Sequence, residues 1–246
     1  MSKNKNITVV LNGYKRGHHL EKQLNAIKNQ TIKPKEIMLW QNLGENFDKK
    51  LTNQTIHASS NKNFGVWARF AYSLNADSEY ICIFDDDTIP GCKWLENCLN
   101  TIEEYDGLLG TIGVRFKSKT SYLPIERVGW ANPNEKVEKV DIVGHSWFFK
   151  REWLSSFWRE LPTLEQSRLV GEDMHFSYTL QKFLNKNTYV PPHPINDMSM
   201  WGSLPDTAWS IGQDSAAISM NHNNLNVMSK TFVDYVNKGF KLMIDN

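Results

Sequence analysis

The sequence predicts an α/β fold in which a mainly parallel central sheet is flanked by helices. Short apolar runs typical of buried strands alternate with segments whose apolar residues recur at helical spacing. This alternation is regular in the first half of the chain and weaker in the second half. With 246 residues, of which 40% are hydrophobic, the chain is long enough to bury one sizeable core. Strands that alternate with helices predict a sheet covered on both faces.

The first expected strand is the apolar run at residues 7–11 (ITVVL). Apolar residues at i, i+4 and i+7 from Leu20 then predict an amphipathic helix that ends at Pro34. The next strand is expected at 36–40 (EIMLW), and a weaker one at 55–58 (TIHA). These segments predict a βαββ order for the N-terminal part.

A second helix is expected to bury one face, formed by Trp67, Phe70, Ala71 and Leu74. It leads into a strand at 80–84 (YICIF). A third helix begins after Pro90-Gly91, with an apolar face of Leu95, Cys98, Leu99 and Ile102. Further strands are expected at 108–116 and 140–149, with a loop or hairpin at 126–139 between them.

The last part of the chain predicts fewer regular elements. A helix over 172–184 is indicated by Phe176, Leu180, Phe183 and Leu184. Residues 191–213 show little periodicity, and 198–210 are interpreted as a lid. The segment 231–243 has apolar residues at helical spacing, and we expect it to pack on the domain rather than on a membrane.

Composition limits the class of partner. The formal net charge is +1 and the basic residues are dispersed, so we expect no nucleic-acid partner. Three cysteines form neither a disulfide framework nor a metal-binding spacing, which favours a reducing compartment. No run approaches the length of a membrane span. We therefore expect a cytoplasmic protein without a transmembrane segment, with peripheral membrane association as an alternative and the oligomeric state left open.

Three adjacent carboxylates, Asp85, Asp86 and Asp87, directly follow the buried strand at 80–84. Ligands of a parallel sheet gather beyond the carboxyl ends of its strands. In an extended segment, Asp85 and Asp87 share one face while Asp86 points away. A divalent cation takes such oxygen ligands and removes their repulsion, whereas a solvated acidic turn is the simpler alternative.

A second acidic pair, Glu172 and Asp173, lies at the start of the helix expected over 172–184. The free N–H groups of a helix start stabilise carboxylates as anions, so Asp173 is interpreted either as a helix cap or as a catalytic base. Together with the triplet, the pair favours catalysis. One cluster holds a metal against a phosphate leaving group while the other accepts a proton from a hydroxyl.

These motifs resemble glycosyltransferases of the GT-A fold, and family 2 in particular, whose members build surface polysaccharides. The first resemblance is ITVVLNGYKR at 7–16, followed by LEKQLNAIKNQTIKPKEIMLWQN at 20–42. The second is NKNFGVWARFAYSLNADSEYICIFDDDTIP at 61–90, which ends in the family's Asp-x-Asp motif. GEDMHFS at 171–177 and YVPPH at 189–193 complete it. The resemblance implies a single GT-A domain over 1–246, with a nucleotide-sugar-binding half (1–105) and an acceptor-binding half (106–246).

The resemblance also implies roles for individual residues. Asp87 binds a divalent cation, Mn²⁺ or Mg²⁺, that bridges the donor diphosphate, and Asp85 contacts the sugar or ribose or a metal-bound water. Asp86 is the least essential of the triplet. His193 completes the metal shell, with His222 as a weaker candidate.

The same resemblance places the nucleoside-diphosphate sugar against five further residues. Tyr14, Arg16 and Asn42 line the nucleoside pocket, and Asn63 and Arg69 lie near the ribose and phosphates. Many relatives have an aspartate where Asn42 stands, so the base of the donor remains open.

For catalysis, the resemblance implies that Asp173 is the general base of an inverting transfer to a hydroxyl of a saccharide acceptor. Retaining GT-A enzymes of the exostosin type also carry an Asp triplet and a Glu-Asp helix start, so retention is an alternative. Trp147 and Trp201 are candidates to stack on an acceptor sugar.

Two other classes share part of the pattern. IFDDDTI resembles the Asp-x-Asp start of haloacid-dehalogenase-type phosphatases, but Ile89 stands where they carry threonine or valine. A non-catalytic sugar-binding module would explain the nine tryptophans but not the two acidic clusters. The glycosyltransferase interpretation accounts for both acidic clusters.

Overall fold

The computed structural model describes residues 6–43, 47–161, 168–205 and 222–245. Its strands are β1 (Ile7–Gly13), β2 (Glu36–Asn42), β3 (Ile56–Ser60), β4 (Tyr80–Phe84), β5 (Leu108–Phe116), β6 (Ile125–Gly129), β7 (Glu138–Val140), β8 (Ile142–Lys150) and β9 (Thr188–Val190). The α-helices are α1 (Leu20–Lys28), α2 (Lys49–Thr52), α3 (Ala68–Tyr72), α4 (Trp94–Tyr105), α5 (Leu154–Phe157), α6 (Glu172–Leu184) and α8 (His222–Asn237). Short 3-10 turns are η1 (Gly17–His19), η2 (Ser73–Asn75), η3 (Arg151–Trp153), η4 (Met198–Met200) and η6 (Met243–Asp245).

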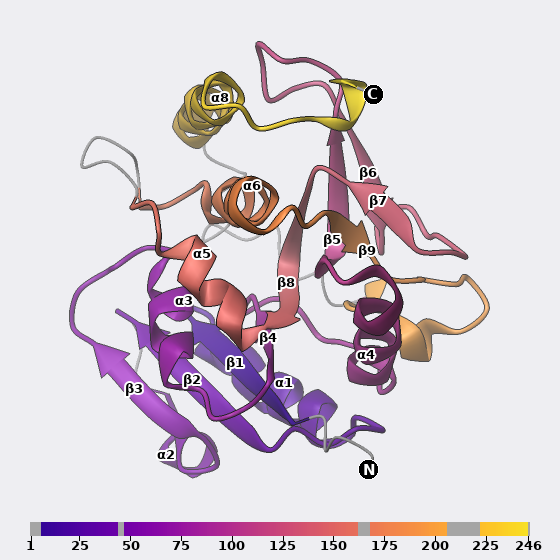
Figure 1. Cartoon of the computed structure of the whole chain (residues 1–246). Helices are drawn as coiled ribbons and strands as arrows, with labels where there is room; N and C mark the ends of the chain where they lie inside the picture. The colour runs from indigo at the N-terminus through magenta and orange to yellow at the C-terminus, as the bar shows by residue number, and fades with distance from the viewer. Residues whose placement is uncertain (1–5, 44–46, 162–167, 206–221, 246) are drawn as a thin grey trace.

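The described strands form one sheet in the order β3-β2-β1-β4-β8-β5-β9-β7, with β6 paired to the C-terminal half of β5 (Figure 1). β1, β2, β3 and β4 pair in parallel. β8 is antiparallel to both β4 and β5, so β5 and its parallel neighbour β9 run in the same direction as β4. β6 and β7 run the other way. The predicted α/β fold with a mainly parallel sheet is confirmed.

The register between β1 and β4 positions the acidic triplet. Leu11 of β1 pairs with Phe84 of β4, and both strands run in the same direction. The chain therefore leaves β1 and β4 side by side at the same edge of the sheet. The loop that starts at Gly13 and the triplet that starts at Asp85 meet at this edge.

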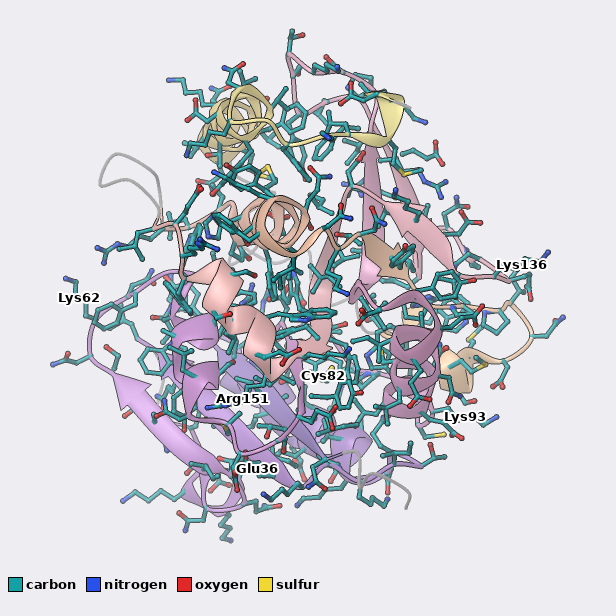
Figure 2. The ribbon with its side chains drawn as sticks, in the orientation of Figure 1. Glu36, Lys62, Cys82, Lys93, Lys136 and Arg151 are labelled. Atoms are coloured by element: carbon teal, nitrogen blue, oxygen red, sulfur yellow. The ribbon has the colours of Figure 1, made fainter. Side chains whose placement is uncertain are left out.

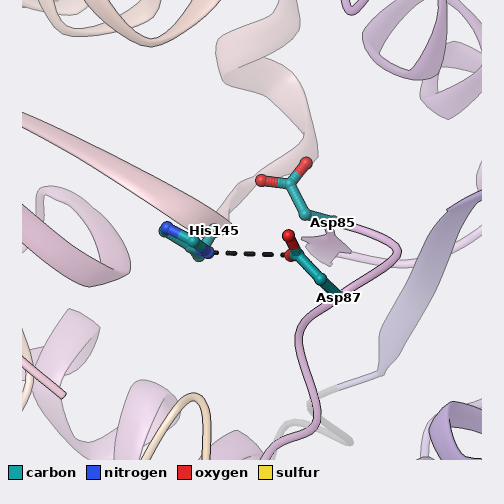
Figure 3. A group of neighbouring side chains, drawn as sticks. All are labelled: Asp85, Asp87 and His145. Atoms are coloured by element: carbon teal, nitrogen blue, oxygen red, sulfur yellow. Dashed lines mark ion pairs between the residues drawn. The ribbon is translucent and has the colours of Figure 1, made fainter. Parts of the chain in front are cut away.

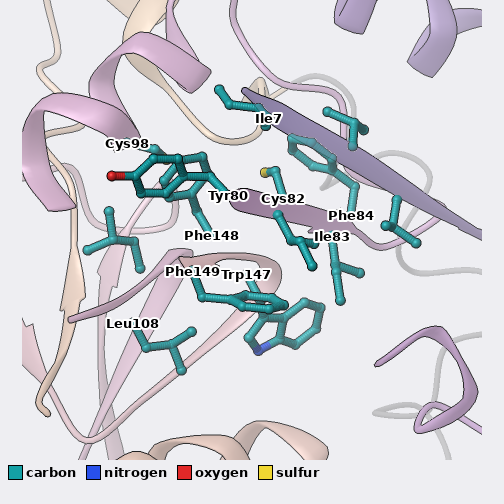
Figure 4. Packing of buried hydrophobic residues seen from close by; sticks show 14 of the residues in the cluster. Ile7, Tyr80, Cys82, Ile83, Phe84, Cys98, Leu108, Trp147, Phe148 and Phe149 are labelled. Atoms are coloured by element: carbon teal, nitrogen blue, oxygen red, sulfur yellow. The ribbon is translucent and has the colours of Figure 1, made fainter. Parts of the chain in front are cut away.

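The core lies around β4 and β8 and is rich in aromatic side chains (Figures 2 and 4). Phe70 of α3 stacks on Phe157 of α5, with ring centroids 4.6 Å apart, and it contacts the edge of the Trp147 ring. Each fully buried side chain of this size contributes about 1.5–3 kcal/mol of burial free energy. α3, α5 and α6 are thereby fastened to one face of the sheet.

The C-terminal helix α8 packs against α6 and the end of β5, as expected (Figure 1). Phe232 contacts Phe116 of β5, and Tyr235 contacts Tyr178 of α6. Phe240 lies beyond the helix end but belongs to the same buried cluster. Within the described ranges, no helix combines the length and the apolarity that crossing a bilayer requires.

Several local details differ from what the sequence predicts. The first helix ends at Lys28 rather than at Pro34, because Gln30 turns toward α4 and bonds the Gly91 carbonyl and the Leu95 N–H. Leu74 is 46% exposed, since the chain passes into the turn η2 before it. Of the loop or hairpin expected at 126–139, the two ends belong to β6, which pairs with β5, and to β7, which pairs with β9, while the residues between them form a loop.

The segment interpreted as a lid is described only in part. The described part of 198–210, up to residue 205, is hydrogen-bonded along the segment that follows the acidic triplet. Gly91 donates to the Trp201 carbonyl at 2.8 Å, and Leu204 donates to the Ile89 carbonyl at 2.8 Å. This part is therefore docked on the domain. Residues 206–210 lie outside the described residues.

Candidate active site

A pocket of about 290 Å³ opens beyond the carboxyl ends of the parallel strands and is closed on one side by the start of α6. Its lining contains all the predicted nucleotide, metal and catalytic residues except His193 and the weaker candidate His222: Tyr14, Arg16, Asn42, Asn63, Arg69, Asp85, Asp86, Asp87 and Asp173. These residues come from segments up to 159 positions apart in the chain, between Tyr14 and Asp173. The fold thus brings the two acidic clusters into one cavity.

Asp85, Asp87 and His145 form a group whose possible ligand atoms all lie within 4.8 Å of one another (Figure 3). His145 Nδ1 lies 3.7 Å from Asp87 Oδ1, which is too far for a hydrogen bond. This buried nitrogen has no hydrogen-bond partner among the described residues. A nitrogen and carboxylate oxygens that converge without bonding directly fit the ligand set of a divalent cation.

His145 was not predicted as a metal ligand, because it lies inside a strand. The pairing of β8 with β5 shifts in register opposite Gly110 and Ile112, and His145 adopts a positive φ of 64° at this bulge. A bulge re-aims a side chain that would otherwise follow the pleat. The Asp85 N–H donates to the His145 carbonyl at 3.0 Å and holds the bulge beside the triplet. The preceding Gly144 was the available sequence signal, since a glycine inside a strand often marks a bulge.

Arg16 pairs with the acidic triplet. Its Nη1 donates to Asp86 Oδ1 at 2.8 Å and to Asp87 Oδ2 at 2.9 Å. The second oxygen of Asp86 accepts from the Tyr14 N–H at 3.1 Å. Asp86 therefore fastens the loop after β1 to the triplet, and its side chain is not turned away as the alternation predicted.

Side chains of the first helical segment hold the backbone of the triplet. Gln23 of α1 donates to the carbonyls of Asp85, at 2.6 Å, and Thr88, at 3.0 Å. His19 of η1 lies 3.1 Å from the Asp86 carbonyl. These buried contacts give three adjacent carboxylates a single backbone conformation, which a solvated acidic turn does not require.

The pKa values of Asp86 and Asp87 diverge. Burial raises the pKa of Asp86 to about 7, although Arg16 acts in the opposite direction. Burial also acts to raise the pKa of Asp87, but the contacts with His145 and Arg16 outweigh it and bring the pKa down to about 2. Burial lowers the pKa of His145, and the neighbouring Asp87 carboxylate reverses this, so the net shift is upward. Asp87 thus stays ionised at neutral pH.

Arg69 links the triplet to the second acidic pair. Its guanidinium is 2% exposed, donates to Asp85 through Nη1 and to Glu172 through Nη2 at 2.7 Å, and lies 4.4 Å from the centre of the Trp147 ring. A solvated helix arginine is excluded. The bridge ties the end of β4 to the first turn of α6.

Asp173 lines the pocket at the start of α6, but it is not the N-cap of the helix. The N-cap position belongs to Gly171, whose φ is +92°. Asp173 Oδ1 accepts from the Met174 N–H at 2.7 Å. Burial raises the pKa of Asp173 to about 6 and that of its neighbour Glu172 to about 8. Among the described lining residues, five carboxyl groups face two guanidinium groups, so the pocket favours a cation.

Asn42 and Asn63 form a network on the opposite side of the pocket. Asn42 donates to Asn63 Oδ1 at 2.9 Å and to the Gly65 carbonyl at 3.2 Å, while its own oxygen accepts from the Phe64 N–H at 2.8 Å. Asn63 in turn donates to the Tyr14 hydroxyl at 3.3 Å. The Asn42 amide therefore holds the 63–65 turn at the pocket that Asn42 itself lines.

His193 does not join the metal group. Its Nδ1 lies 2.8 Å from the Pro191 carbonyl, and its Nε2 accepts from the Gly202 N–H at 3.1 Å. Both ring nitrogens are thus occupied by the backbone, and burial lowers the pKa of the ring to about 4. The side chain of His222 lies outside the described residues.

The tryptophans proposed as acceptor platforms are also buried. Trp147 is 2% exposed beneath Arg69, and Trp201 is 4% exposed with its Nε1 donating to the Pro194 carbonyl at 2.7 Å. Neither ring presents a face to the pocket. On the α8 side, the pocket is instead lined by Leu169 and Met228.

Comparisons with known proteins place these features in context. The family model described as glycosyl transferase family 2 matches residues 8–176. The crystal structure of S. aureus TarS residues 1–349 aligns with a TM-score of 0.53 at 15% identity, covering 77% of this chain and 58% of that one. A second S. aureus TarS structure aligns with a TM-score of 0.55 at 13% identity, covering 96% of this chain and 44% of that one. At these identities the likeness supports the fold. No curated protein matches the chain.

Proposed function

Because the chain belongs to glycosyl transferase family 2, we propose that it moves a sugar from a nucleoside-diphosphate sugar to a hydroxyl of a saccharide acceptor. The observation that carries this proposal is the single pocket that contains both the Asp85–Asp87–His145 group and Asp173. The activity serves the synthesis of a surface polysaccharide or another glycan. Residues 1–105 supply most of the donor side, and 106–246 supply His145, Asp173 and the wall on the acceptor side.

The set of side chains that could act as metal ligands fits a divalent cation, Mn²⁺ or Mg²⁺. Asp87 supplies an ionised carboxylate, Asp85 supplies another oxygen, and His145 supplies a buried nitrogen without a partner among the described residues. When bound, such a cation neutralises the diphosphate of the departing nucleotide. Arg16 occupies the other Asp87 oxygen and keeps the carboxylate oriented toward the site. His145 replaces His193 in the proposed metal set.

The nucleoside lies against the loop after β1 and the 63–65 turn. Tyr14 and Asn63 face this part of the pocket, and Asn42 fixes the turn from behind. Arg69 lies near the phosphates while it holds Asp85. Selectivity for the nucleoside base then depends on the backbone N–H and C=O groups of this turn, because the Asn42 side-chain amide is already hydrogen-bonded.

Asp173 acts as the general base. It accepts the proton of the acceptor hydroxyl as that oxygen attacks the anomeric carbon from the side opposite the departing nucleoside diphosphate. This geometry gives inversion. Its raised pKa of about 6 supports the role, since a base is most effective when its pKa lies near the working pH. Retention remains the alternative outcome.

A thermal-shift screen tests the donor. The parent protein is heated with UDP, GDP, dTDP or CDP, with and without Mn²⁺. One nucleotide should stabilise it only with the metal, by about 2.7 kcal/mol at 100 times its Kd. Asp87→Asn should abolish this stabilisation, whereas Asp48→Asn, a helix cap outside the pocket, should retain it. If none of the four stabilises the parent, the donor assignment fails.

Product analysis separates the enzyme classes. Incubation with the corresponding nucleotide-sugar should release nucleoside diphosphate slowly without an acceptor and faster with one. A haloacid-dehalogenase-type phosphatase would release inorganic phosphate, and a binding module would release neither product.

A further inference from the structure

A second pocket, of about 370 Å³, lies at the opposite end of α6 from Asp173. It is formed where the last turns of α6 meet β7, β9 and the turn that follows α8. The two pockets share no lining residue. The second pocket is therefore distinct from the proposed active site.

Positive charge dominates this second pocket. Its lining contains one carboxylate, Asp141, and five lysines: Lys139, Lys182, Lys186, Lys238 and Lys241. Asp141 is already bonded, because its two oxygens accept from the Phe116 N–H at 2.8 Å and the Met243 N–H at 2.7 Å. The formal net charge of the whole chain is only +1, so this density of lysines is local.

Two of the five lysines have carboxylate partners. Lys182 pairs with Glu160, and Lys186 pairs with Asp106. A cation near the end of a helix is favoured by the helix dipole, which accounts for these two. Lys139, Lys238 and Lys241 come from other elements, and no carboxylate of the described chain lies within ion-pair distance of their ammonium groups.

The segment that carries Lys241 is held against α6 by hydrogen bonds. Gln181 of α6 donates to the Lys241 carbonyl at 2.9 Å and accepts from the Lys241 N–H at 2.8 Å. Gly239, with a φ of +97°, makes the turn that places Lys238 and Lys241 on the same pocket. The backbone that presents these two ammonium groups is thus held in one position relative to α6.

The pocket also contains a polar group without a partner. Ser177 lines it from α6, is 1% exposed, and its Oγ makes no hydrogen bond to any residue that the structure describes. A buried hydroxyl left unpaired costs free energy, so a site of this kind is completed by a ligand or a water. Lysine ammonium groups beside a hydroxyl donor are a set that binds phosphate oxygens.

We propose that this second pocket binds a phosphate group carried by a ligand of about the size of a sugar phosphate. The ammonium groups of Lys238, Lys241 and Lys139 contact the phosphate oxygens, and the Ser177 hydroxyl donates to the same group. The pocket volume suits a unit of this size. Such a phosphate is supplied either by a phosphorylated saccharide or by a phospholipid headgroup.

Calorimetric titration of the full chain tests the site. Inorganic phosphate and glucose 1-phosphate are titrated at constant ionic strength into the parent, Lys238→Gln/Lys241→Gln, and the control Lys49→Gln/Lys50→Gln. The control removes two exposed lysines of α2 and the same total charge. The parent and the control should bind saturably, and the pocket variant should bind at least about tenfold more weakly.

Two further variants separate a specific contact from a folding defect. Lys238→Arg/Lys241→Arg should restore most of the affinity, and Ser177→Ala should weaken binding about two- to tenfold. Melting curves without ligand should be close to that of the parent for all variants. Equal binding by the parent and Lys238→Gln/Lys241→Gln, or no saturable binding by the parent, would overturn the proposal.

Vesicle sedimentation distinguishes the two sources of phosphate. Vesicles of phosphatidylcholine are compared with vesicles that also contain phosphatidylglycerol. A lipid headgroup predicts that the parent and Lys49→Gln/Lys50→Gln sediment with the phosphatidylglycerol vesicles while the pocket variant does not. A phosphorylated saccharide predicts binding of glucose 1-phosphate with no difference between the proteins on vesicles.

Discussion

Replacing Arg69 by alanine should destabilise the protein strongly, because the buried Glu172 carboxylate and the half-buried Asp85 carboxylate lose their common partner. The Arg69 side chain is 2% exposed, and those of Glu172 and Asp85 are 10% and 28% exposed. Removing one member of a buried ion pair costs about 3–5 kcal/mol, since the remaining charge stays desolvated. For a chain of this size, that cost lowers the melting temperature by about 6–20 °C.

The measurement is urea unfolding at pH 8, with Arg159→Ala as the matched control. The Arg159 guanidinium also lies 4.4 Å from the centre of an aromatic ring, that of Phe183, but it is exposed and pairs with no carboxylate among the described residues. Its removal should cost no more than about 1 kcal/mol. The deficit of Arg69→Ala should shrink at pH 5, where protonation neutralises Glu172. Equal stability of the two variants, or a deficit independent of pH, would refute the buried-bridge argument.

Three other outcomes follow from the site. Asp173→Asn should keep metal-dependent donor binding and lower sugar transfer at least about a hundredfold in a product assay. Normal transfer by this variant would exclude the role of Asp173 as general base. NMR of the product made by the parent should show an inverted anomeric centre. His145→Ala should weaken Mn²⁺ binding in calorimetry at least about tenfold, as expected for a lost ligand, while His57→Ala, an exposed control, should not. Without metal, the melting temperature should fall between pH 6.5 and 8.5. Burial raises the folded-state pKa of Asp86 to about 7 and of Glu172 to about 8, so stability that is complete below their unfolded values is lost as each ionises. Mn²⁺ should reduce this slope, and a rise in melting temperature over the same range would contradict the assignment.

Most of the local structure could be predicted from the order of the residues. The segments that became β1, β4 and β5 are buried along almost their whole length, and such a strand depends mainly on its own composition. The acidic residues that line the pocket were also predicted, because each follows a strand or starts a helix. These are local signals, which a single segment carries.

The errors concern contacts between distant segments. His145 lies in the site because a bulge in β8 turns its ring toward Asp87, and the bulge exists only in the pairing with β5. His193 follows a strand as predicted, yet the backbone at Pro191 and Gly202 engages both of its nitrogens.

For Arg69, too, the sequence predicted the local position but not the contacts with distant segments. Its place on a helix near the donor side follows from the sequence, whereas its contact with Glu172 joins residues 103 positions apart. Residue type and spacing determine which groups are able to bind a metal or move a proton. The burial and the hydrogen-bond partners of each group depend on which segments pack together. Burial and partners in turn determine the charge state and orientation of the group, because desolvation and hydrogen bonding act over a few ångströms in space regardless of separation along the chain.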